Sequence, residues 1–477
     1  MDDVLIVGAG PVGLMLACEL SLAGVRSIVL DKRPQPGDIP KANGLGGQII
    51  ELLDHRGLLE RFSAGSPFSG RAPGFPFGAV PLSFAGLDDI PMRLLLIQQP
   101  RLEELLTERA LELGAEIRRG CEVRSLAQDE EGVTLDTTRG ELRARYVAGC
   151  DGAGSRVREC LGIGFPGDTE EEGLLVGHFK AEAGTFESLE RDGLEPGWTR
   201  RPNGRLLLTS LREGVLIAGV RERGDLPEGQ VSLDDFRAAV HRVLGRELPL
   251  GEPIWMSSTR AQARLAERYR DGRVFLAGDA AHLFPAGGSA LNVGMTDAVN
   301  LGWKLAARLR GRAGDRLLET YEAERRPAGE RTLLQTRAQS AIDRVAGEDG
   351  AALRALLGEV FAYEQPLRHL AGLLHGADTR YGAADHPLAG RFVPELVLDD
   401  GRRVAELMRA ARPVLLDLGG GAELDDLDGW IDVVRAAAPD PPADALLIRP
   451  DGYVAWAGAE GMAEAVRVMC GLTTSRA

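Results

Sequence analysis

Residues 4–13 read Val-Leu-Ile-Val-Gly-Ala-Gly-Pro-Val-Gly, and this stretch decides the fold. Its first four residues are apolar and stop at a glycine, which predicts a short buried strand. Residues 11–23 predict a helix and residues 26–30 a second strand, so that about thirty residues form a βαβ unit. The glycines fit the pattern G-x-G-x-x-G, and a strand before it and a helix after it are the context that a dinucleotide-binding turn requires.

Each glycine of this turn has its own role. Gly8 permits the tight turn, Gly10 lets the backbone approach a pyrophosphate, and Gly13 lets the helix pack closely on the strand. The N–H groups at the helix N-terminus then face the phosphates. Asp31 ends the second strand, where its carboxylate can accept a hydrogen bond from a ribose hydroxyl and would repel a 2′-phosphate. The turn therefore predicts FAD or NAD, and argues against NADP at this site; a purely structural glycine turn is the alternative.

Composition limits the classes of function. The chain has 477 residues, enough for two to four domains, and a formal net charge of −15, which argues against nucleic acid as a partner. The five cysteines are never spaced as C-x-x-C, so we expect a reduced cytoplasmic protein with neither a disulfide framework nor a metal site. We expect no signal peptide and no membrane span, because Glu19 interrupts the most apolar helix.

The remaining pattern predicts an α/β protein with further parts. Glycine-punctuated strands at 165–270 predict a mixed-sheet domain inserted into the nucleotide-binding fold, and residues 62–95, rich in Gly, Pro and Phe, are expected to join it. Single helices are expected over 47–61 and 290–310, with more to about 375. Beyond a boundary at His386 we expect a βαββα unit, formed by residues 413–418, 426–437, 445–448, 453–456 and 459–470.

Two downstream motifs decide between FAD and NAD. Residues 150–156 read Cys-Asp-Gly-Ala-Gly-Ser-Arg, and residues 275–282 read Phe-Leu-Ala-Gly-Asp-Ala-Ala-His. With the glycine turn they resemble the three fingerprints of class A flavin-dependent aromatic hydroxylases, the p-hydroxybenzoate hydroxylase-like family. Over residues 3–470 the chain is most similar to polyketide hydroxylases and rifampicin monooxygenase-type enzymes.

That resemblance implies an activity. It implies FAD as cofactor, NADPH as a transient reductant, oxygen, and a bulky aromatic polyketide-like substrate oxygenated through a flavin C4a-hydroperoxide. Baeyer–Villiger insertion, epoxidation, inactivation of an antibiotic, and a non-redox FAD-binding protein remain open alternatives. A flavin disulfide reductase is disfavoured because no paired cysteines follow the first motif, and a halogenase because no Trp-x-Trp-x-Ile-Pro occurs.

The resemblance also implies site residues. In the family the aspartate of the Gly-Asp pair, here Asp279, binds the ribityl chain, and Asp151 either contacts the cofactors or orients nearby backbone. Gln99 matches a family glutamine, Val123 would bring backbone to the adenine, and Lys41 stands near the position of a flavin-contacting arginine. The expected cofactor-binding set is Gly8, Gly10, Pro11, Val12, Gly13, Asp31, Lys32, Arg33, Lys41, Ala42, Gln99, Val123, Cys150, Asp151, Gly152, Gly278, Asp279, Pro285, Gly287, Gly288, Ser289, Ala290, Leu291 and Asn292.

The loop after His282 is implied to lie along the flavin ring. Its backbone N–H groups and the helix opening near Ser289 would stabilise negative charge on reduced flavin, so the candidate catalytic residues are Pro285, Gly287 and Gly288 and no acid or base is expected. The family usually has Gly-Gly-Gln-Gly where this chain has Gly-Gly-Ser-Ala, in a loop one residue shorter. Ala290 adopts a positive φ less readily than glycine. His282 is expected to pack or cap.

The resemblance implies three domains. A Rossmann-like FAD-binding domain would comprise 1–61, 96–164 and 271–385; a substrate-binding domain, 62–95 and 165–270; and a thioredoxin-like domain without C-x-x-C, 386–477. The substrate pocket is expected between the flavin loop and the 165–270 sheet. Trp255, Phe77 and Phe179 are candidate lining residues, although core packing is the expected role of each. A homodimer is one expected assembly.

Overall fold

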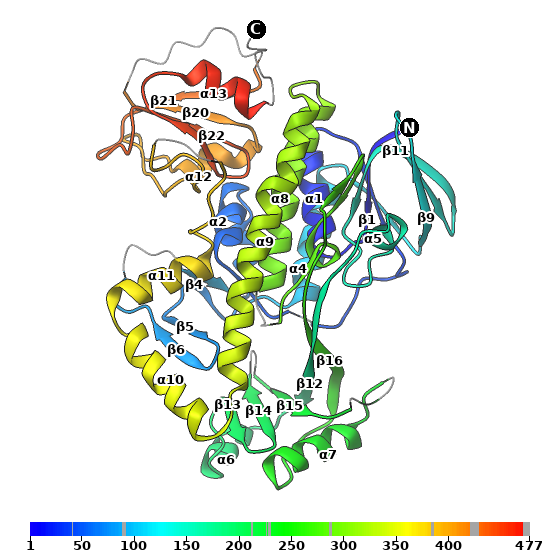
Figure 1. Ribbon diagram of the computed structural model, residues 1–477, viewed down its shortest axis with the longest axis vertical. Helices are drawn as coiled ribbons and strands as arrows, with labels where there is room; N and C mark the ends of the chain where they lie inside the picture. The colour runs from blue at the N-terminus through cyan, green and yellow to red at the C-terminus, as the bar shows by residue number, and fades with distance from the viewer. Residues whose placement is uncertain are drawn as a thin grey trace.

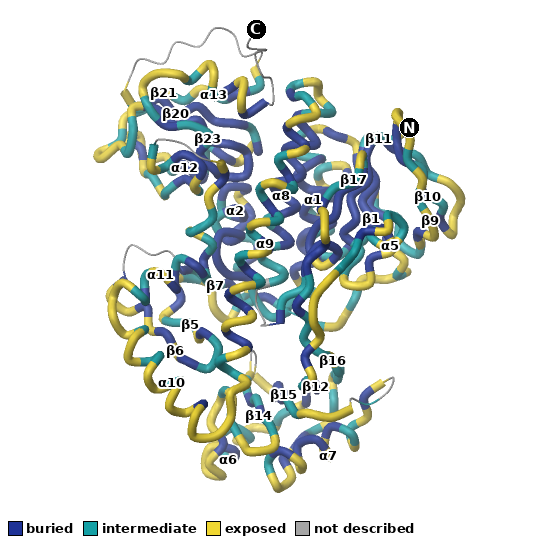
Figure 2. The backbone as a smooth tube through the Cα atoms, viewed as in Figure 1, coloured by how far each residue is buried: buried dark blue, intermediate teal, exposed yellow. Residues whose placement is uncertain are grey.

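The computed structural model describes residues 1–40, 42–87, 92–210, 213–225, 227, 230–285, 289–382, 386–419 and 429–470. Two long helices, α8 (Ser289–Leu309) and α9 (Asp315–Arg344), run through the middle of the molecule. Figure 1 shows a six-stranded sheet at one end and a small C-terminal unit at the other. Figure 2 shows that the segments around α1, α8 and β1 form the most continuously buried part.

The expected βαβ unit is confirmed. Strand β1 pairs in parallel with β2 and with β11, and α1 (Pro11–Leu22) connects the first two. The sheet has the order β17-β18-β11-β1-β2-β8, with β10 and β9 continuing from β11. Its strands are β1 (Asp2–Val7), β2 (Ser27–Asp31), β8 (Glu116–Arg119), β9 (Val123–Gln128), β10 (Val133–Thr137), β11 (Gly140–Gly149), β17 (Arg270–Asp271) and β18 (Val274–Leu276).

Helices cover this sheet. Nine of the twelve residues of α1 are buried, because the helix lies between the sheet and the neighbouring helices α8 and α4. The helix expected at 47–61 is instead two helices, since Gly57 adopts a φ of 65° that ends the first one. The remaining helices of this part are α2 (Gln48–His55), α3 (Leu59–Ser63), α4 (Gln99–Glu112) and α5 (Arg156–Cys160), with the 3-10 turn η1 (Gly278–Ala280).

The inserted sheet is antiparallel, so the expectation of a mixed sheet is wrong for the described residues. Every pair along the order β13-β14-β15-β12-β16-β19 is antiparallel, and a two-residue turn joins β13 to β14. One face packs on α7 (Leu233–Leu244). The other elements are α6 (Thr185–Arg191), β12 (Gly167–Lys180), β13 (Gly197–Arg201), β14 (Gly204–Thr209), β15 (Val215–Arg223), β16 (Pro253–Leu265) and β19 (His282–Leu283).

The segment 62–95 forms small sheets of its own. Phe77 is 5% exposed and packs with Leu82 and Phe84 against α11, in a separate apolar cluster. Within the described residues its strands pair with one another and with β3, not with the six-stranded sheet. The elements are β3 (Leu45–Gly46), β4 (Ser69–Arg71), β5 (Gly74–Phe77), β6 (Val80–Ser83), β7 (Arg93–Leu95), α10 (Gly347–Phe361) and α11 (Glu364–His375). Its membership of the substrate-binding domain stays a prediction.

The C-terminal unit has a four-stranded sheet in the order β21-β20-β22-β23. The helix expected at 426–437 is wrong for its described part, which contains strand β21 parallel to β20. Val433 and Val434 favour a strand, and Val434 packs into the core of the unit. The elements are α12 (Val404–Leu407), η2 (Met408–Ala410), β20 (Val414–Asp417), β21 (Asp432–Arg435), β22 (Ala445–Ile448), β23 (Val454–Ala457) and α13 (Met462–Met469).

Buried ionic contacts attach this unit to the rest of the chain. The guanidinium of Arg56 donates to both carboxylate oxygens of Glu19 at 2.8 Å and to the carbonyl oxygens of Met408 and Pro450. A second cluster joins Lys304 and Glu324 of α8 and α9 to Arg449 and Asp451 of the unit. Burial lowers the pKa of Lys304 to about 8.

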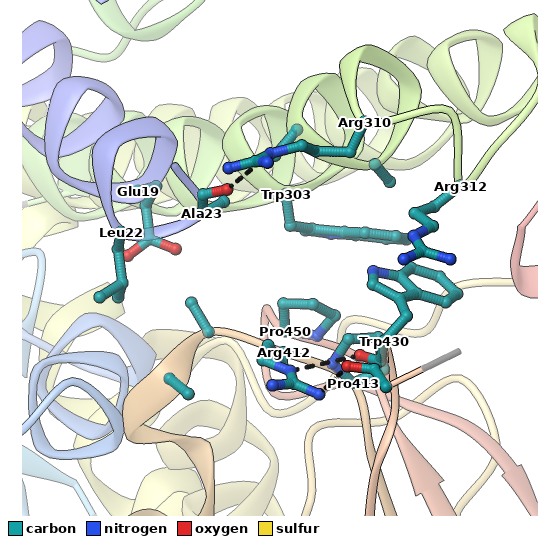
Figure 3. A pocket seen from close by; sticks show the side chains of 15 residues that line it. Glu19, Leu22, Ala23, Trp303, Arg310, Arg312, Arg412, Pro413, Trp430 and Pro450 are labelled. Atoms are coloured by element: carbon teal, nitrogen blue, oxygen red, sulfur yellow. Dashed lines mark hydrogen bonds between the residues drawn. The ribbon is translucent and has the colours of Figure 1, made fainter. Parts of the chain in front are cut away.

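A cleft of about 390 Å³ lies along this junction (Figure 3). Trp303 and Arg310 line it from one side, and Trp430 and Arg412 from the C-terminal unit. Arg310 donates to the carbonyl oxygen of Ala23, and Arg412 to that of Trp430. None of the residues expected to bind a cofactor lines this cleft.

His55 at the same junction should make stability depend on pH. It is 4% exposed and stacks on Phe392 with ring centroids 5.3 Å apart. Burial lowers its pKa from 6.5 to about 3, so below pH 6.5 the unfolded chain binds a proton that the folded chain does not. This group therefore lowers the free energy of unfolding by about 1.4 kcal/mol for each pH unit below its unfolded pKa.

The variant His55→Phe keeps the ring and removes the titration. Relative to it, we expect the wild type to lose about 2 kcal/mol between about pH 7 and about pH 5, measured by chemical denaturation. Parallel stability profiles of the two proteins over this interval would contradict the assignment.

Three further observations concern general properties. All five cysteines are free thiols. Among the described residues, no helix is long and apolar enough to cross a membrane. The same part of the chain contains no group of three or more His, Cys, Asp or Glu side chains arranged to hold a metal ion.

Candidate active site

The glycine turn brings the first two motifs together. Gly8 has a φ of 110°, and a Cβ placed on it would lie 2.3 Å from the carbonyl oxygen of Cys150. A Cβ on Gly13 would lie 2.0 Å from the carbonyl oxygen of Gly8. The first position therefore requires glycine for its backbone conformation and its contact, and the second for the close packing of α1 on the turn.

Gly10 differs from these two glycines. It is the N-cap of α1 with φ −83° and ψ 179°, and no side chain caps the helix. A Cβ placed on it would meet no protein atom within 4 Å. An uncapped helix N-terminus beside open space fits the pyrophosphate of FAD, because the first-turn N–H groups can donate to phosphate oxygens.

Asp31 holds the turn in place. Its buried carboxylate accepts hydrogen bonds from the backbone N–H of Ala9 at 2.9 Å and of Arg33 at 2.7 Å. Burial opposes ionisation, but these bonds and the Arg33 guanidinium keep the pKa of the carboxyl below its usual value. The sequence did not indicate this contact with Ala9. Hydrogen bonding to a ribose hydroxyl stays a prediction.

Arg119 was missed by the sequence analysis. It ends β8, directly beside Asp31 in the parallel register. Its two terminal nitrogens are buried and have no hydrogen-bond partner in the part of the chain that the structure describes. A buried guanidinium without a protein acceptor at this edge of the sheet suits an acceptor from a ligand.

Asp151 acts on the backbone. Its carboxylate accepts hydrogen bonds from the Ser155 hydroxyl at 2.5 Å and from the N–H groups of Arg156 and Val157 at 2.7 and 3.1 Å. These bonds fasten the start of α5, and Gly152 turns the chain with a φ of 84°. Of the two roles expected for Asp151, the structure supports the orienting one.

Four further residues of the expected cofactor-binding set precede Asp151 in the chain: Lys32, Lys41, Gln99 and Val123. Gln99 donates from its amide side chain to Glu103 at 2.8 Å and from its backbone to the carbonyl oxygen of Ala42. Val123 begins β9 and is buried, whereas Lys32 is exposed. Lys41 lies outside the described residues.

The Gly-Asp turn meets the glycine turn. Gly278 has a φ of 63°, and a Cβ placed on it would lie 2.8 Å from a methyl carbon of Val12. Asp279 is exposed between two buried residues, Gly278 and Ala280. The first and third motifs therefore meet, and an exposed aspartate follows Gly278 at this junction. Binding of the ribityl chain by Asp279 stays a prediction.

His282 is fully buried, which confirms packing as its role. Its Nε2 lies 2.8 Å from an oxygen of Asp297, and its ring stacks on Phe284 at 4.7 Å. Burial opposes ionisation of Asp297, but Arg325 and His282 keep its pKa below the usual value. The same carboxylate accepts from the N–H of Gly278 at 3.1 Å.

The altered loop is described only in part. Gly287 and Gly288 lie outside the described residues, so their contact with flavin stays a prediction; Pro285 is buried. The helix α8 begins at Ser289 and includes Ala290, Leu291 and Asn292. Helical backbone has negative φ, so Ala290 needs no positive φ and the substitution for glycine causes no strain there.

Of the three candidate lining residues of the substrate pocket, two are core residues and one is half-buried. Phe179 is fully buried and packs edge-on against Phe236, and Phe77 lies in the cluster of segment 62–95, so both are core residues as expected. Trp255 is half-buried and lies edge-on to His178.

These observations define a flavoprotein of the βαβ dinucleotide class. A model of the FAD binding domain matches residues 1–336, and a model of the aromatic-ring hydroxylase C-terminal region matches residues 386–472. The chain belongs to the FAD-dependent aromatic-ring hydroxylase family and is a monooxygenase flavoprotein.

Three similar proteins span nearly the whole chain. The 12-dehydrotetracycline 5-monooxygenase/anhydrotetracycline 6-monooxygenase of Streptomyces rimosus subsp. rimosus is 43% identical, over 98% of this chain and 99% of its own. A rifampicin monooxygenase of Streptomyces venezuelae is 41% identical over 96% of each. The solved structure of the Diels-Alderase PyrE3 from pyrroindomycin biosynthesis matches with a TM-score of 0.87 at 37% identity, over 98% of this chain and 99% of that one.

Proposed function

We propose that this chain uses FAD, NADPH and oxygen to hydroxylate or otherwise oxygenate a bulky, polycyclic aromatic molecule of the polyketide type. The full-length similarity to a tetracycline-pathway monooxygenase and to a rifampicin monooxygenase supports this substrate class. The observation that carries the proposal is the open, uncapped helix N-terminus at Gly10, in a turn that meets the Gly278-Asp279 turn through Val12. When bound there, FAD supplies hydride acceptance and oxygen activation.

The residues of this chain supply binding and position. First-turn N–H groups of α1 would bind the pyrophosphate, and Asp279 the ribityl hydroxyls. The N-terminus of α8 would stabilise negative charge on the ring without a cationic side chain. No acid or base of the protein is assigned to the oxygen transfer.

A substrate wall is available on the six-stranded sheet. On the face opposite α7, Leu207, Gly219 and Val176 lie in one row across three paired strands. Leu207 and Val176 are half-exposed, and Leu207 packs closely over the glycine between them, since a Cβ on Gly219 would lie 3.3 Å from the Cβ of Leu207. Trp255 and His178 continue this face in the next row. We propose that the aromatic substrate packs here, which suits a flat apolar ligand.

The domain assignments are part of this proposal. Residues 1–61, 96–164 and 271–385 would bind FAD, 62–95 and 165–270 would bind substrate, and 386–477 would be a thioredoxin-like module. That module has one cysteine, Cys470, so it would not act as a dithiol. Exposed Leu353, Leu356 and Val360 along α10 support a homodimer. We place the protein in the cytoplasm.

Oxygen labelling tests the activity. With NADPH, ¹⁸O₂ and a panel of tetracyclic and naphthoquinone-type aromatics, we expect one product that carries a single ¹⁸O atom, detected by mass spectrometry. The variant Val176→Trp should retain FAD and its reduction by NADPH but lose turnover, because the added ring fills the proposed wall. Label incorporated from water, or NADPH oxidation that forms only hydrogen peroxide with every aromatic, would contradict the proposal.

A second candidate is a non-redox FAD protein. The relative that supports it is the Diels-Alderase, since a cycloaddition needs no net electron transfer, and its structure matches this chain as fully as the monooxygenases do. Consumption of NADPH by the bound flavin separates the two candidates.

A further inference from the structure

Arg325 lies at the junction of three parts of the chain. It belongs to α9 and is 4% exposed. Its Nε donates to Asp297 at 2.7 Å, one terminal nitrogen to the Tyr381 hydroxyl at 2.8 Å, and the other to the Thr296 hydroxyl at 2.9 Å. All three nitrogens of the guanidinium are therefore used, each toward a different side chain.

Two of these contacts lead to the flavin site. Thr296 lies two turns into α8, the helix that begins at the flavin loop, and Arg325 also reaches the carbonyl oxygen of Val293 at 3.4 Å. Asp297 binds the N–H of Gly278 and the ring of His282, on either side of Asp279. One guanidinium thus fixes the start of α8 directly and the Gly-Asp turn through one carboxylate.

The third contact leads to the C-terminal unit. The ring of Tyr381 stacks on Tyr453 with centroids 4.0 Å apart and an interplanar angle of 27°. The Tyr453 hydroxyl donates to the amide oxygen of Gln48 at 2.9 Å, and Phe392 packs edge-on against the same ring. Through Tyr381 and Arg325, a row of contacts therefore joins Phe392 and Tyr453 to α8 and to the Gly278–His282 turn.

Charge and shape make the guanidinium hard to replace. Burial opposes the charge of Arg325, but Tyr381 and Asp297 hold its pKa well above the usual value. The planar fork offers donors in fixed directions to three acceptors, whereas a lysine ammonium is a point charge on a flexible stem. Loss of the fork would free the Asp297 carboxylate to move, and with it the Gly278 turn.

We propose that Arg325 is a positioning residue for the cofactor, through which Tyr381, and behind it Tyr453 of the C-terminal unit, set the affinity and reduction potential of the flavin. The inference rests on the proposed FAD site. It assigns the C-terminal unit a role at the flavin.

The test uses purified full-length protein and two activity-independent measurements, the dissociation constant of FAD by flavin fluorescence and the midpoint potential of the bound flavin. Arg325→Lys should raise the dissociation constant about tenfold or more, the equivalent of one lost charged hydrogen bond, and shift the potential. Tyr381→Phe removes one hydrogen-bond acceptor of Arg325. It should change the dissociation constant and the potential in the same direction as Arg325→Lys, but by a smaller amount.

Arg56→Lys is the matched control. Arg56 is equally buried and also joins the C-terminal unit to the nucleotide-binding part. Its hydrogen-bond partners, Glu19, Met408 and Pro450, belong neither to the Gly278–His282 turn nor to α8. We expect Arg56→Lys to melt at a lower temperature with unchanged FAD affinity and potential. A folded Arg325→Lys with wild-type values overturns the proposal, as does an equal shift in Arg56→Lys.

If Arg325→Lys does not fold, the same two measurements are made on Tyr381→Phe and Tyr453→Phe. Wild-type FAD affinity and midpoint potential in both variants would overturn the proposal. These readouts do not require NADPH or an aromatic substrate. Failure of the monooxygenase activity in the wild type would therefore be distinguished from failure of this inference.

Discussion

The variant Gly10→Val is expected to fold as the wild type does and to purify without FAD, with its affinity for added FAD at least about 100-fold weaker. Valine tolerates the extended backbone at this position, φ −83° and ψ 179°, and its Cβ would meet no protein atom within 4 Å. The added methyl groups would instead occupy the space where the pyrophosphate must approach the backbone. Fluorescence titration with FAD measures the loss.

Gly13→Val is the contrasting variant. Its Cβ would lie 2.0 Å from the carbonyl oxygen of Gly8, so the protein must rearrange whether or not FAD is present. We expect its melting temperature without FAD to fall well below that of Gly10→Val. If Gly10→Val retains wild-type FAD affinity, the pyrophosphate does not lie at this turn.

The variant Arg56→Met is expected to lose about 3–5 kcal/mol of stability, because it leaves the Glu19 carboxylate buried without its partner. Both side chains are 2% exposed, and the guanidinium binds both carboxylate oxygens. The substitution also removes donors to the carbonyl oxygens of Met408 and Pro450. Urea denaturation monitored by tryptophan fluorescence measures the loss.

The double variant Glu19→Leu, Arg56→Met is the control for this pair. Removing both charges ends the desolvation penalty, so we expect the double variant to be more stable than Arg56→Met alone. Equal stability of the two variants would mean that the pair itself contributes little and that the carbonyl contacts hold the C-terminal unit.

Sequence patterns predicted those parts of the fold in which consecutive elements follow each other directly along the chain. The apolar run ending at Gly8 and the spacing to Asp31 predicted the βαβ unit because a strand, a turn and a helix follow each other without interruption. The region 426–437 was misassigned for the opposite reason. Asp432–Arg435 is a strand because it pairs with β20, a partner that helical periodicity alone does not reveal.

The network behind the site could not be predicted in this way. His282 and Arg325 both contact Asp297, but they come from β19 and α9, and only the packing of these elements around α8 brings them together. Arg56 at the end of a short helix would be expected to face solvent, and its partner Glu19 interrupts an apolar helix. Their pairing explains how a charge is accommodated at the buried junction.

The visible spectrum of the FAD-bound protein under anaerobic NADPH tests the central claim most directly. The oxygenase account predicts that the absorbance of oxidised flavin bleaches, at the latest when a suitable aromatic is present, and recovers when air is admitted. A bound flavin that stays oxidised with NADPH and every aromatic tested would contradict it and would favour the non-redox function.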